Sequence, residues 1–243
     1  MIPLLDPFET DGGGKALGGE VREAMLDWSS VETVLLDLDG TLLDPHFDTH
    51  FWTEHLPLRY AERSGIGLAA AKAELAPRLK AREGSLAWYC VDHWTRELGI
   101  EIAEIKREVA HLIAPHPRVP EFLAALRALG KRVVLATNAH PKSLAIKLPR
   151  VGLTGHFDAI LCAHDLGAPK EQPRFWELAR THEPFDGRRT LLIDDNLACL
   201  RTAKAAGVRF LYGVLRPDSR APPNPPSEFP AITGFGEIMP PCR

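Results

Sequence analysis

Residues 34–44 read VLLDLDGTLLD, an aliphatic run that ends in two carboxylates. The run at 34–36 is typical of a strand that is buried on both faces of a sheet. Asp37 and Asp39 follow it directly, one residue apart, and a Gly-Thr pair comes next. Two acids at the end of a hydrophobic strand repel each other and lose hydration. Their presence at this position therefore requires an explanation from the rest of the chain.

Five short aliphatic runs predict the strands of a single sheet. Each is rich in Val, Ile and Leu without clear alternation, as in strands covered on both sides; they lie at 33–36, 132–136, 159–163, 190–193 and 208–214. Helix-like segments separate the later runs, at 141–148, 173–180 and 197–206. This alternation predicts an α/β fold with a doubly wound parallel sheet, whose ligands bind at the carboxyl ends of the strands.

The stretch 45–129 contains helix-like pieces and no convincing strand. Two apolar stripes at helical spacing predict packing faces, formed by Leu86, Cys90, Trp94 and Leu98 and by Ile102, Ile105, Val109 and Leu112. We therefore predict a small helical subdomain at 45–129, inserted into an α/β core made of 30–44 and 130–243. Residues 1–29 are predicted to be a flexible N-terminal extension, and the proline-rich segment 217–241 to be irregular.

The composition limits the classes of protein to consider. The chain has 243 residues, of which 45% are hydrophobic and 25% charged, as in ordinary globular proteins. A net charge of −3 without a long basic run argues against binding to nucleic acid polymers or membranes, and no apolar stretch is long enough to span a bilayer. Four cysteines without a CxxC pair predict reduced thiols in a cytoplasmic protein and argue against a zinc site: Cys90, Cys162, Cys199 and Cys242.

The other predicted strands also lead into polar residues. Because parallel strands end at the same edge of a sheet, we expect seven side chains to meet there: Asp37, Asp39, Thr137, Asn138, Lys170, Asp194 and Asp195. Four carboxylates at one edge would repel one another without a cation among them. Oxygen ligands favour a hard ion, above all Mg²⁺.

The same residues predict phosphoryl chemistry. With Mg²⁺, the Lys170 ammonium and the Thr137 hydroxyl would hold a phosphoryl group, whose oxygens need positive charge and donors. Asp37 can attack phosphorus as an anion, while Asp39 passes a proton to the departing oxygen. Taken alone, each residue has a simpler explanation, such as a helix cap, a turn, a structural cation site or a solvated lysine. Their joint occurrence, each beyond a separate strand, favours the phosphoryl site.

These motifs resemble those of the haloacid dehalogenase-like superfamily, whose phosphatases carry a DxDGT first motif. The resemblance covers residues 31–215 and implies a Rossmann-like core with a cap inserted after the first motif, where the helical stretch lies. It also implies a Mg²⁺-dependent phosphatase. Dehalogenases of this superfamily lack the second acid and transporting ATPases carry DKTGT, so Asp39 and its neighbours favour a phosphatase.

The resemblance implies a role for each residue of the first two motifs. Asp37 corresponds to the nucleophile that forms an aspartyl-phosphate. Asp39 corresponds to the general acid and base, whose backbone carbonyl also binds Mg²⁺. Thr137 corresponds to the hydroxyl that binds phosphate, near the backbone N–H of Asn138.

The third and fourth motifs complete the implied site. Lys170 corresponds to the motif lysine, although Glu171 and Gln172 stand between it and the proline that follows directly in many members. Asp195 corresponds to the metal-binding acid of the fourth motif, with Asp194 as an additional ligand. The implied Mg²⁺ ligands are therefore Asp37, Asp39, Asp194 and Asp195.

Five longer segments resemble bacterial GMP/IMP 5′-nucleotidases: DPHFDTHFW, LAWYCVDHWTRELGIEI, TNAHPKSLAIKL, LGAPKEQPRFW and LRPDSR. The first two lie in the predicted cap, where substrate selection resides in this superfamily. The resemblance implies that the substrate is a purine nucleoside 5′-monophosphate. A phosphatase for another small substrate such as a sugar phosphate, a phosphomutase, and a silent scaffold whose cap binds a protein remain alternatives.

Several residues of the cap and of the second motif are candidates for substrate contacts, although core packing is the commoner role of such side chains. An aromatic ring could stack on the purine base, from Trp52, Trp88 or Tyr89. The polar candidates are His46, His50, Arg59 and, next to the second motif, His140.

Overall fold

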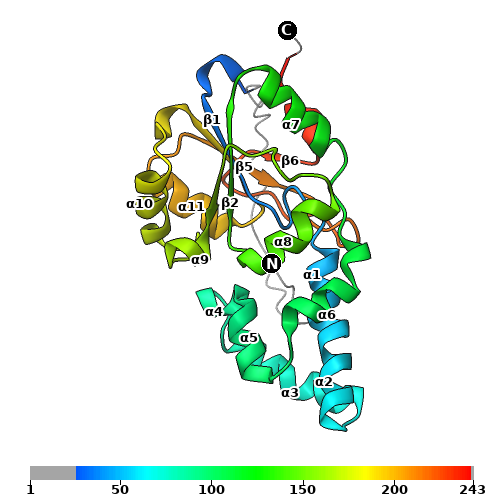
Figure 1. The fold of residues 1–243 in the computed structure, drawn as a ribbon. Helices are drawn as coiled ribbons and strands as arrows, with labels where there is room; N and C mark the ends of the chain where they lie inside the picture. Colours follow the sequence, from blue (N-terminus) through cyan, green and yellow to red (C-terminus); the bar gives the residue numbers. More distant parts are fainter. Residues whose placement is uncertain (1–25, 242–243) are drawn as a thin grey trace, which may run out of the picture.

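A sheet of six parallel strands forms the centre of the computed structural model, which describes residues 26–241 (Figure 1). The strands are β1 (Thr33–Leu36), β2 (Arg132–Thr137), β3 (Ala159–Cys162), β4 (Thr190–Ile193), β5 (Phe210–Val214) and β6 (Ala231–Ile232). Their order across the sheet is β3-β2-β1-β4-β5-β6, and each neighbouring pair is parallel. The predicted α/β fold with a doubly wound parallel sheet is confirmed.

The first predicted strand lies in the middle of this sheet. β1 pairs with β2 on one side and β4 on the other, so that Leu35 lies between Val134 and Leu192. All four residues of β1 are buried, which explains its continuous apolar run. β6 was not predicted, because two residues within a proline-rich segment show no periodicity; they pair with the end of β5.

Helices cover both faces of the sheet. Those of the core are α7 (Val119–Ala128), α8 (Pro141–Arg150), α9 (Ala163–Leu166), α10 (Pro173–His182) and α11 (Leu197–Ala205), with short turns η1 (Trp28–Ser30), η4 (Gly187–Arg189) and η5 (Phe235–Ile238). Val34 and Leu36 join one hydrophobic cluster with α7 and α8, whereas Leu35 joins another with α10 and α11. Alternate side chains of β1 therefore anchor opposite layers. Over the described range, no helix is both long and apolar enough to cross a bilayer.

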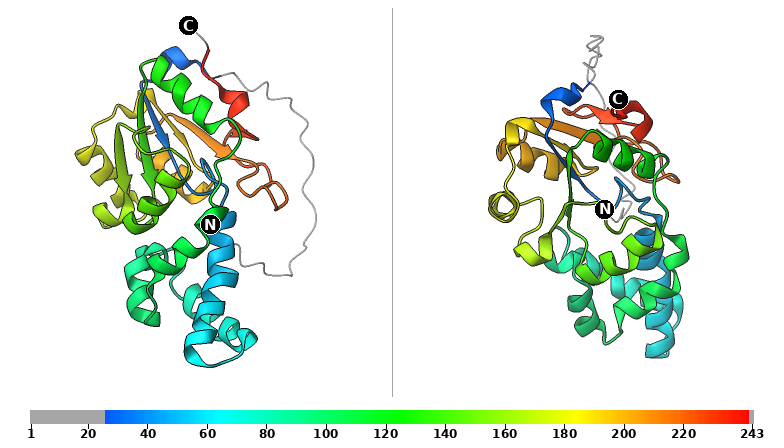
Figure 2. Two further views of the ribbon diagram at one scale, coloured as in Figure 1. Left: turned by 45° about the vertical axis from the view of Figure 1, so that its right-hand side comes forward. Right: turned by 45° about the horizontal axis from the view of Figure 1, so that its top comes forward.

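The stretch between β1 and α7 is helical, as predicted. Its helices project from one end of the sheet (Figures 1 and 2). They are α1 (His46–His50), a π-helical turn η2 (Phe51–His55), α2 (Leu56–Ser64), α3 (Leu68–Lys80), α4 (Leu86–Tyr89), α5 (Val91–Leu98), α6 (Ile102–Glu108) and η3 (Ala110–Leu112).

The two chain segments that enter and leave this stretch run side by side. Asp44 N donates to Ala114 O at 3.0 Å, and His116 N donates to Leu42 O at 2.9 Å. Beyond them, α7 packs against β2 and therefore belongs with the sheet. We propose that the inserted cap comprises 45–113, ending before α7, and that these paired segments connect it to the core.

Cys90 interrupts the first predicted packing stripe, because it lies between α4 and α5 rather than inside one helix. Its backbone is extended (φ −84°, ψ 107°), and its Sγ accepts a hydrogen bond from His93 N at 3.3 Å, which caps α5. Trp94 and Leu98 are buried, as the spacing predicted. The spacing of four identified the buried face but could not show the break in the helix.

The predicted N-terminal extension is described only in part. Residues 1–25 lie outside the described residues, as does Cys242. Within 26–29, Trp28 is buried, and its ring lies 6.1 Å from that of Phe122 between centroids. This end of the extension therefore packs on the core.

Leu192→Ala is expected to lower the free energy of unfolding by about 3 kcal/mol, because Leu192 is fully buried in the central sheet and its truncation leaves a cavity. Urea denaturation followed by circular dichroism measures the change. Leu58→Ala is the matched control: Leu58 is 41% exposed, and its loss should change stability by less than about 0.5 kcal/mol. Equal effects of the two substitutions would contradict this assignment of the core.

Candidate active site

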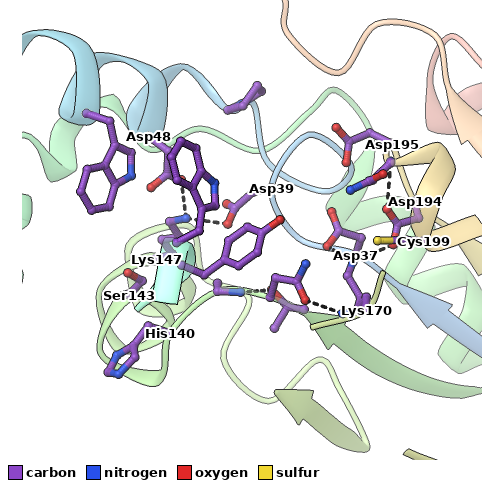
Figure 3. Close-up of a pocket in the computed structure, with 18 of the residues that line it drawn as sticks. Asp37, Asp39, Asp48, His140, Ser143, Lys147, Lys170, Asp194, Asp195 and Cys199 are labelled. Atoms are coloured by element: carbon purple, nitrogen blue, oxygen red, sulfur yellow. Dashed lines mark hydrogen bonds and ion pairs between the residues drawn. The ribbon is translucent and has the colours of Figure 1, made fainter. Parts of the chain in front are cut away.

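Polar side chains gather at the carboxyl ends of β1, β2 and β4 and line one pocket (Figure 3). Asp37 follows β1, Asn138 follows β2, and Asp194 follows β4. Sheets of this topology bind ligands at this edge. The inserted helices supply further lining residues, Trp52 and Trp88 among them, so the pocket lies between the sheet and the cap.

Lys170 lies at the centre of a buried ion-pair network. Its Nζ is 2.5 Å from Asp37 Oδ1 and 2.6 Å from Asp194 Oδ2, and the residue is 2% exposed. Its backbone N–H donates to Asn138 Oδ1 at 2.9 Å, and its carbonyl accepts from Trp176 Nε1 at 2.9 Å. These bonds hold the lysine beside the first motif, although the residues that follow it depart from the usual sequence of the superfamily.

Asp195 completes a cluster of three carboxylates. One oxygen each of Asp37, Asp194 and Asp195 lies within 4.8 Å of the other two. Gly40 permits this approach, because its φ is +89° and a Cβ at this position would lie 2.6 Å from Asp195 Oδ2. Thr41 Oγ1 accepts a hydrogen bond from Asp195 N at 3.2 Å, which orients the loop after β4. The three oxygens are the donor type that hard divalent cations prefer.

Burial dominates the electrostatics of this cluster. It raises the pKa of Asp194 to about 8 and the pKa of Asp195 to about 6, and repulsion from Asp37 adds to both shifts. Burial also disfavours the charged form of Lys170, but Asp194 and Asp37 hold the pKa of Lys170 well above its ordinary value. The positive charge of one ammonium group does not balance the negative charge of three carboxylates. The carboxylate oxygens therefore fit a bound divalent cation.

Asp39 points away from these carboxylates into a second ionic network (Figure 3). Lys147 Nζ lies 2.7 Å from Asp39 Oδ2 and 2.5 Å from Asp48 Oδ2, and Lys106 Nζ donates to Asp48 Oδ1 at 2.7 Å. Both lysines are buried. Burial raises the pKa of Asp39 although Lys147 opposes this shift. At Asp48 the two ammonium groups outweigh burial and lower the pKa.

Three members of this second network were not predicted from the sequence: Asp48, Lys106 and Lys147. They lie on helices outside the motifs, where lysine and aspartate are normally solvated. One signal was available, because Lys106 is four residues after Ile102 and therefore shares the predicted apolar stripe. A buried lysine at such a position indicates a charged partner.

Thr137 and Asn138 lie in the same pocket, and both make bonds to the protein. Thr137 Oγ1 accepts from the backbone N–H two residues later at 3.0 Å, which leaves its own hydrogen for a ligand. Asn138 Nδ2 donates to Glu171 Oε2 at 2.9 Å. Glu171 Oε1 in turn accepts from Asn196 Nδ2 at 3.0 Å and from the hydroxyl of Tyr89 at 2.8 Å. Glu171, which was not predicted as a site residue, thus joins two loops of the core to the cap.

Four of the candidates for substrate contacts line the pocket: Trp52, Trp88, Tyr89 and His140. The other three candidates contact protein groups elsewhere. Arg59 forms an ion pair with Glu108 at 2.6 Å, and His46 Nε2 lies 2.6 Å from Arg220. His50 stacks near a neighbouring imidazole.

A family model matches residues 31–207, a range that contains the whole set of motif residues described above; its description is haloacid dehalogenase-like hydrolase. The chain belongs to the haloacid dehalogenase-like hydrolase family. One relative is the GMP/IMP nucleotidase YrfG of Escherichia coli (strain K12), which is 36% identical over 213 residues that span 88% of this chain and 96% of that protein. Another is the phosphoglycolate phosphatase of Neisseria gonorrhoeae, 26% identical over 75% of this chain and 82% of that protein.

Solved structures share the fold of this haloacid dehalogenase-like hydrolase. The HAD phosphatase from Thermococcus onnurineus has a TM-score of 0.73 at 19% identity, over 86% of this chain and 96% of that one. The L-2-haloacid dehalogenase PA0810 has a TM-score of 0.58 at 15% identity, over 86% and 98%. Such distant structures show the fold alone. The family match and the relatives confirm the predicted family and the predicted enzyme class, a phosphatase.

Gly40→Ala is expected to lower the phosphatase activity about a hundredfold, because the added Cβ displaces the Asp195 carboxylate. Release of p-nitrophenol from p-nitrophenyl phosphate measures the activity. The matched control is Gly65→Ala, which has a similar positive φ of +66° and open space around its Cβ. The control should lose about 1–2 kcal/mol of stability from backbone strain and keep its activity. Similar activities of the two variants would show that the approach of Gly40 to Asp195 is unimportant.

Proposed function

We propose that this enzyme hydrolyses a purine nucleoside 5′-monophosphate through an aspartyl-phosphate on Asp37, with Mg²⁺ as its cofactor. The observation that carries the proposal is the buried contact of Lys170 with both Asp37 and Asp194. It joins a carboxylate that can act as a nucleophile, a cation that can bind a phosphoryl oxygen, and an acid that can hold a metal.

The three clustered carboxylates are the proposed Mg²⁺ ligands: Asp37, Asp194 and Asp195. The family resemblance adds the backbone carbonyl of Asp39. When bound, Mg²⁺ supplies positive charge that orients the phosphoryl group and neutralises its oxygens.

In the first proposed step, a carboxylate oxygen of Asp37 forms a bond to phosphorus while the bond from phosphorus to the ester oxygen breaks. Asp39 donates a proton to the departing 5′-oxygen. The Lys170 ammonium and the Thr137 hydroxyl donate to the phosphoryl oxygens and stabilise the charge that develops there. In the second step Asp39 takes a proton from a water molecule as the water oxygen forms a bond to phosphorus. The bond from phosphorus to the Asp37 oxygen breaks, which releases phosphate and restores the Asp37 carboxylate.

The surroundings of Asp39 suit a carboxyl group that gives up a proton in one step and takes one up in the next. Burial raises its pKa and favours the protonated form, whereas the Lys147 ammonium at 2.7 Å favours the carboxylate. Lys147 is itself held by Asp48 of the cap. We propose Lys147 as a positioning residue, which keeps the Asp39 carboxyl beside the leaving group when the cap is closed.

The proposed nucleotide substrate is supported by the 36% identity to the Escherichia coli GMP/IMP nucleotidase over 88% of this chain. The aromatic side chains of Trp52, Trp88 and Tyr89 line the pocket and offer faces for a purine base. The pocket has a volume of about 100 Å³, smaller than the roughly 300–1,000 Å³ of typical small-molecule sites. Entry of a nucleotide therefore requires the cap to move away from the sheet.

We also propose that the enzyme is cytoplasmic and that its partner is this small molecule rather than a nucleic acid polymer. Cys90, Cys162 and Cys199 are free thiols, which suits a reducing compartment. The net charge of −3 does not favour binding to a polyanion.

Asp37→Asn is expected to lower kcat by at least about a thousandfold, because an amide does not attack phosphorus. Phosphate release from GMP at saturating Mg²⁺ measures the turnover, and circular dichroism verifies the fold. The matched control is Asp165→Asn, an exposed acid of the core, which should retain wild-type turnover. More than about a tenth of wild-type turnover in Asp37→Asn would rule out this nucleophile.

A panel of phosphomonoesters is expected to give values of kcat/KM for GMP and IMP at least about tenfold above those for glucose 6-phosphate and phosphoglycolate. The reason is selection of the purine by the cap. Released phosphate and product analysis are the readouts. A preferred sugar phosphate would overturn the nucleotide proposal, an isomerised phosphate ester would indicate a mutase, and inactivity towards the whole panel would contradict the proposed chemistry.

A further inference from the structure

Cys90, His140 and His164 form a second cluster of metal-binding side chains, apart from the three carboxylates. One ligand atom of each lies within 4.8 Å of the ligand atoms of the other two. Cys90 comes from the cap, between α4 and α5, whereas His140 precedes α8 and His164 lies in α9 of the core. The cluster therefore lies where the cap meets the sheet.

The residue types select the kind of metal. A thiolate and two imidazoles are preferred ligands of Zn²⁺, whereas Mg²⁺ and Ca²⁺ prefer oxygen. Bonds of about 2.0–2.3 Å in a tetrahedral zinc site place ligand atoms roughly 3.3–3.8 Å apart. Separations within 4.8 Å need only a small contraction to reach this geometry. We propose that Cys90, His140 and His164 bind one Zn²⁺ ion, with water in the fourth position.

His164 supplies an independent observation that points to a ligand. Both of its ring nitrogens are shielded from solvent, and neither makes a hydrogen bond of ordinary geometry with the described residues. Its ring packs against that of His140, with centroids 4.7 Å apart. A buried donor or acceptor without a partner carries a free-energy cost. A metal at one nitrogen removes part of this cost, and the backbone of Leu86, which interacts with the ring, suits the other nitrogen.

A metal-bound histidine is commonly oriented by a carboxylate near its other ring nitrogen, and the carboxylate of Asp92 lies near His140. Its Nε2 lies 3.7 Å from Asp92 Oδ2, and its Nδ1 accepts a hydrogen bond from Lys142 N at 3.2 Å. A metal at Nδ1 would replace the bond to Lys142 and leave the Nε2 hydrogen for Asp92. Asp92 lies on α5, directly after the Cys90 break, so the same segment supplies a ligand and its support.

The absence of a CxxC pair argued against zinc, but that signal reports only ligands that are close in sequence. Here the ligands are 50 and 24 residues apart along the chain, and only the fold brings them together. The Sγ of the single cysteine lies at the N-terminus of α5, where it accepts a hydrogen bond from His93 N at 3.3 Å, and a bound Zn²⁺ would displace its proton.

The proposed zinc site would connect the cap to the core beside the active-site pocket. His140 lines the pocket, as does Tyr89, the neighbour of Cys90 in the sequence. A metal across this junction holds the closed arrangement, in which the pocket measures about 100 Å³. Zn²⁺ is therefore expected to slow cap opening and turnover. This consequence rests on the proposed function, whereas the binding itself does not.

The test is a titration of the reduced full-length protein with Co²⁺ at saturating Mg²⁺. Co²⁺ replaces Zn²⁺ in zinc sites and can be followed by its absorption spectrum. We expect one equivalent to give a thiolate-to-cobalt charge-transfer band in the near ultraviolet, which Zn²⁺ then displaces. Cys90→Ser should abolish this band, and His164→Gln should weaken Co²⁺ binding at least about tenfold. Cys199 lines the pocket of the carboxylate cluster, so a thiolate band from Co²⁺ bound there would survive in Cys90→Ser, and this variant separates the two sites.

His182→Gln is the matched control for loss of a histidine, since His182 is exposed at the end of α10, and it should bind Co²⁺ as the wild type does. Circular dichroism verifies that each variant folds. A wild-type titration without a thiolate band, or a band that survives in Cys90→Ser, would overturn the proposed site. Zn²⁺ should inhibit the phosphatase activity of the wild type and leave Cys90→Ser uninhibited. Failure of this measurement alone would contradict the effect on turnover but not the metal site.

Discussion

The structure of the candidate active site depends on one interaction, the ion pairs of the buried Lys170 ammonium with the carboxylates of Asp37 and Asp194. Removal of one partner from such a buried pair leaves a charge without compensation, at a cost of about 3–5 kcal/mol. The two acids come from different strands, and the lysine comes from a loop beyond a third. Their mutual neutralisation therefore brings three segments of the core to the position at which a phosphoryl group would bind.

The second ionic network gives Asp39 a different environment from Asp37, although only one residue separates them. Both residues lie in the turn beyond β1, where Asp37 meets Lys170 and the two other clustered carboxylates, while Asp39 meets Lys147 and, through it, Asp48 of the cap. Two carboxylates with different surroundings can serve two different chemical roles. Because Asp48 belongs to the cap, the position of the cap and the environment of the proposed acid are physically connected.

Glu171 and the Cys90 cluster extend this connection to the other side of the pocket. Glu171 bonds to Tyr89 of the cap as well as to Asn138 and Asn196 of the core. Cys90, the next residue, lies beside two histidines of the core. In the proposed closing of the cap these polar groups come together, whereas the open arrangement would expose them to water, and we propose this coupling as the basis for gating by the cap.

The sequence by itself determined five of the strands, their parallel direction and the polar residues at their ends, because continuous apolar runs and the residues that follow them are local features. It also located the inserted helices, and its resemblance to known phosphatases agreed with the family match. Only the tertiary structure decided which charges pair and which residues surround Lys147, Glu171 and Cys90. Each of these depends on contacts between distant segments. A buried charge, or a buried imidazole without a hydrogen-bond partner, can be recognised only when its neighbours are known.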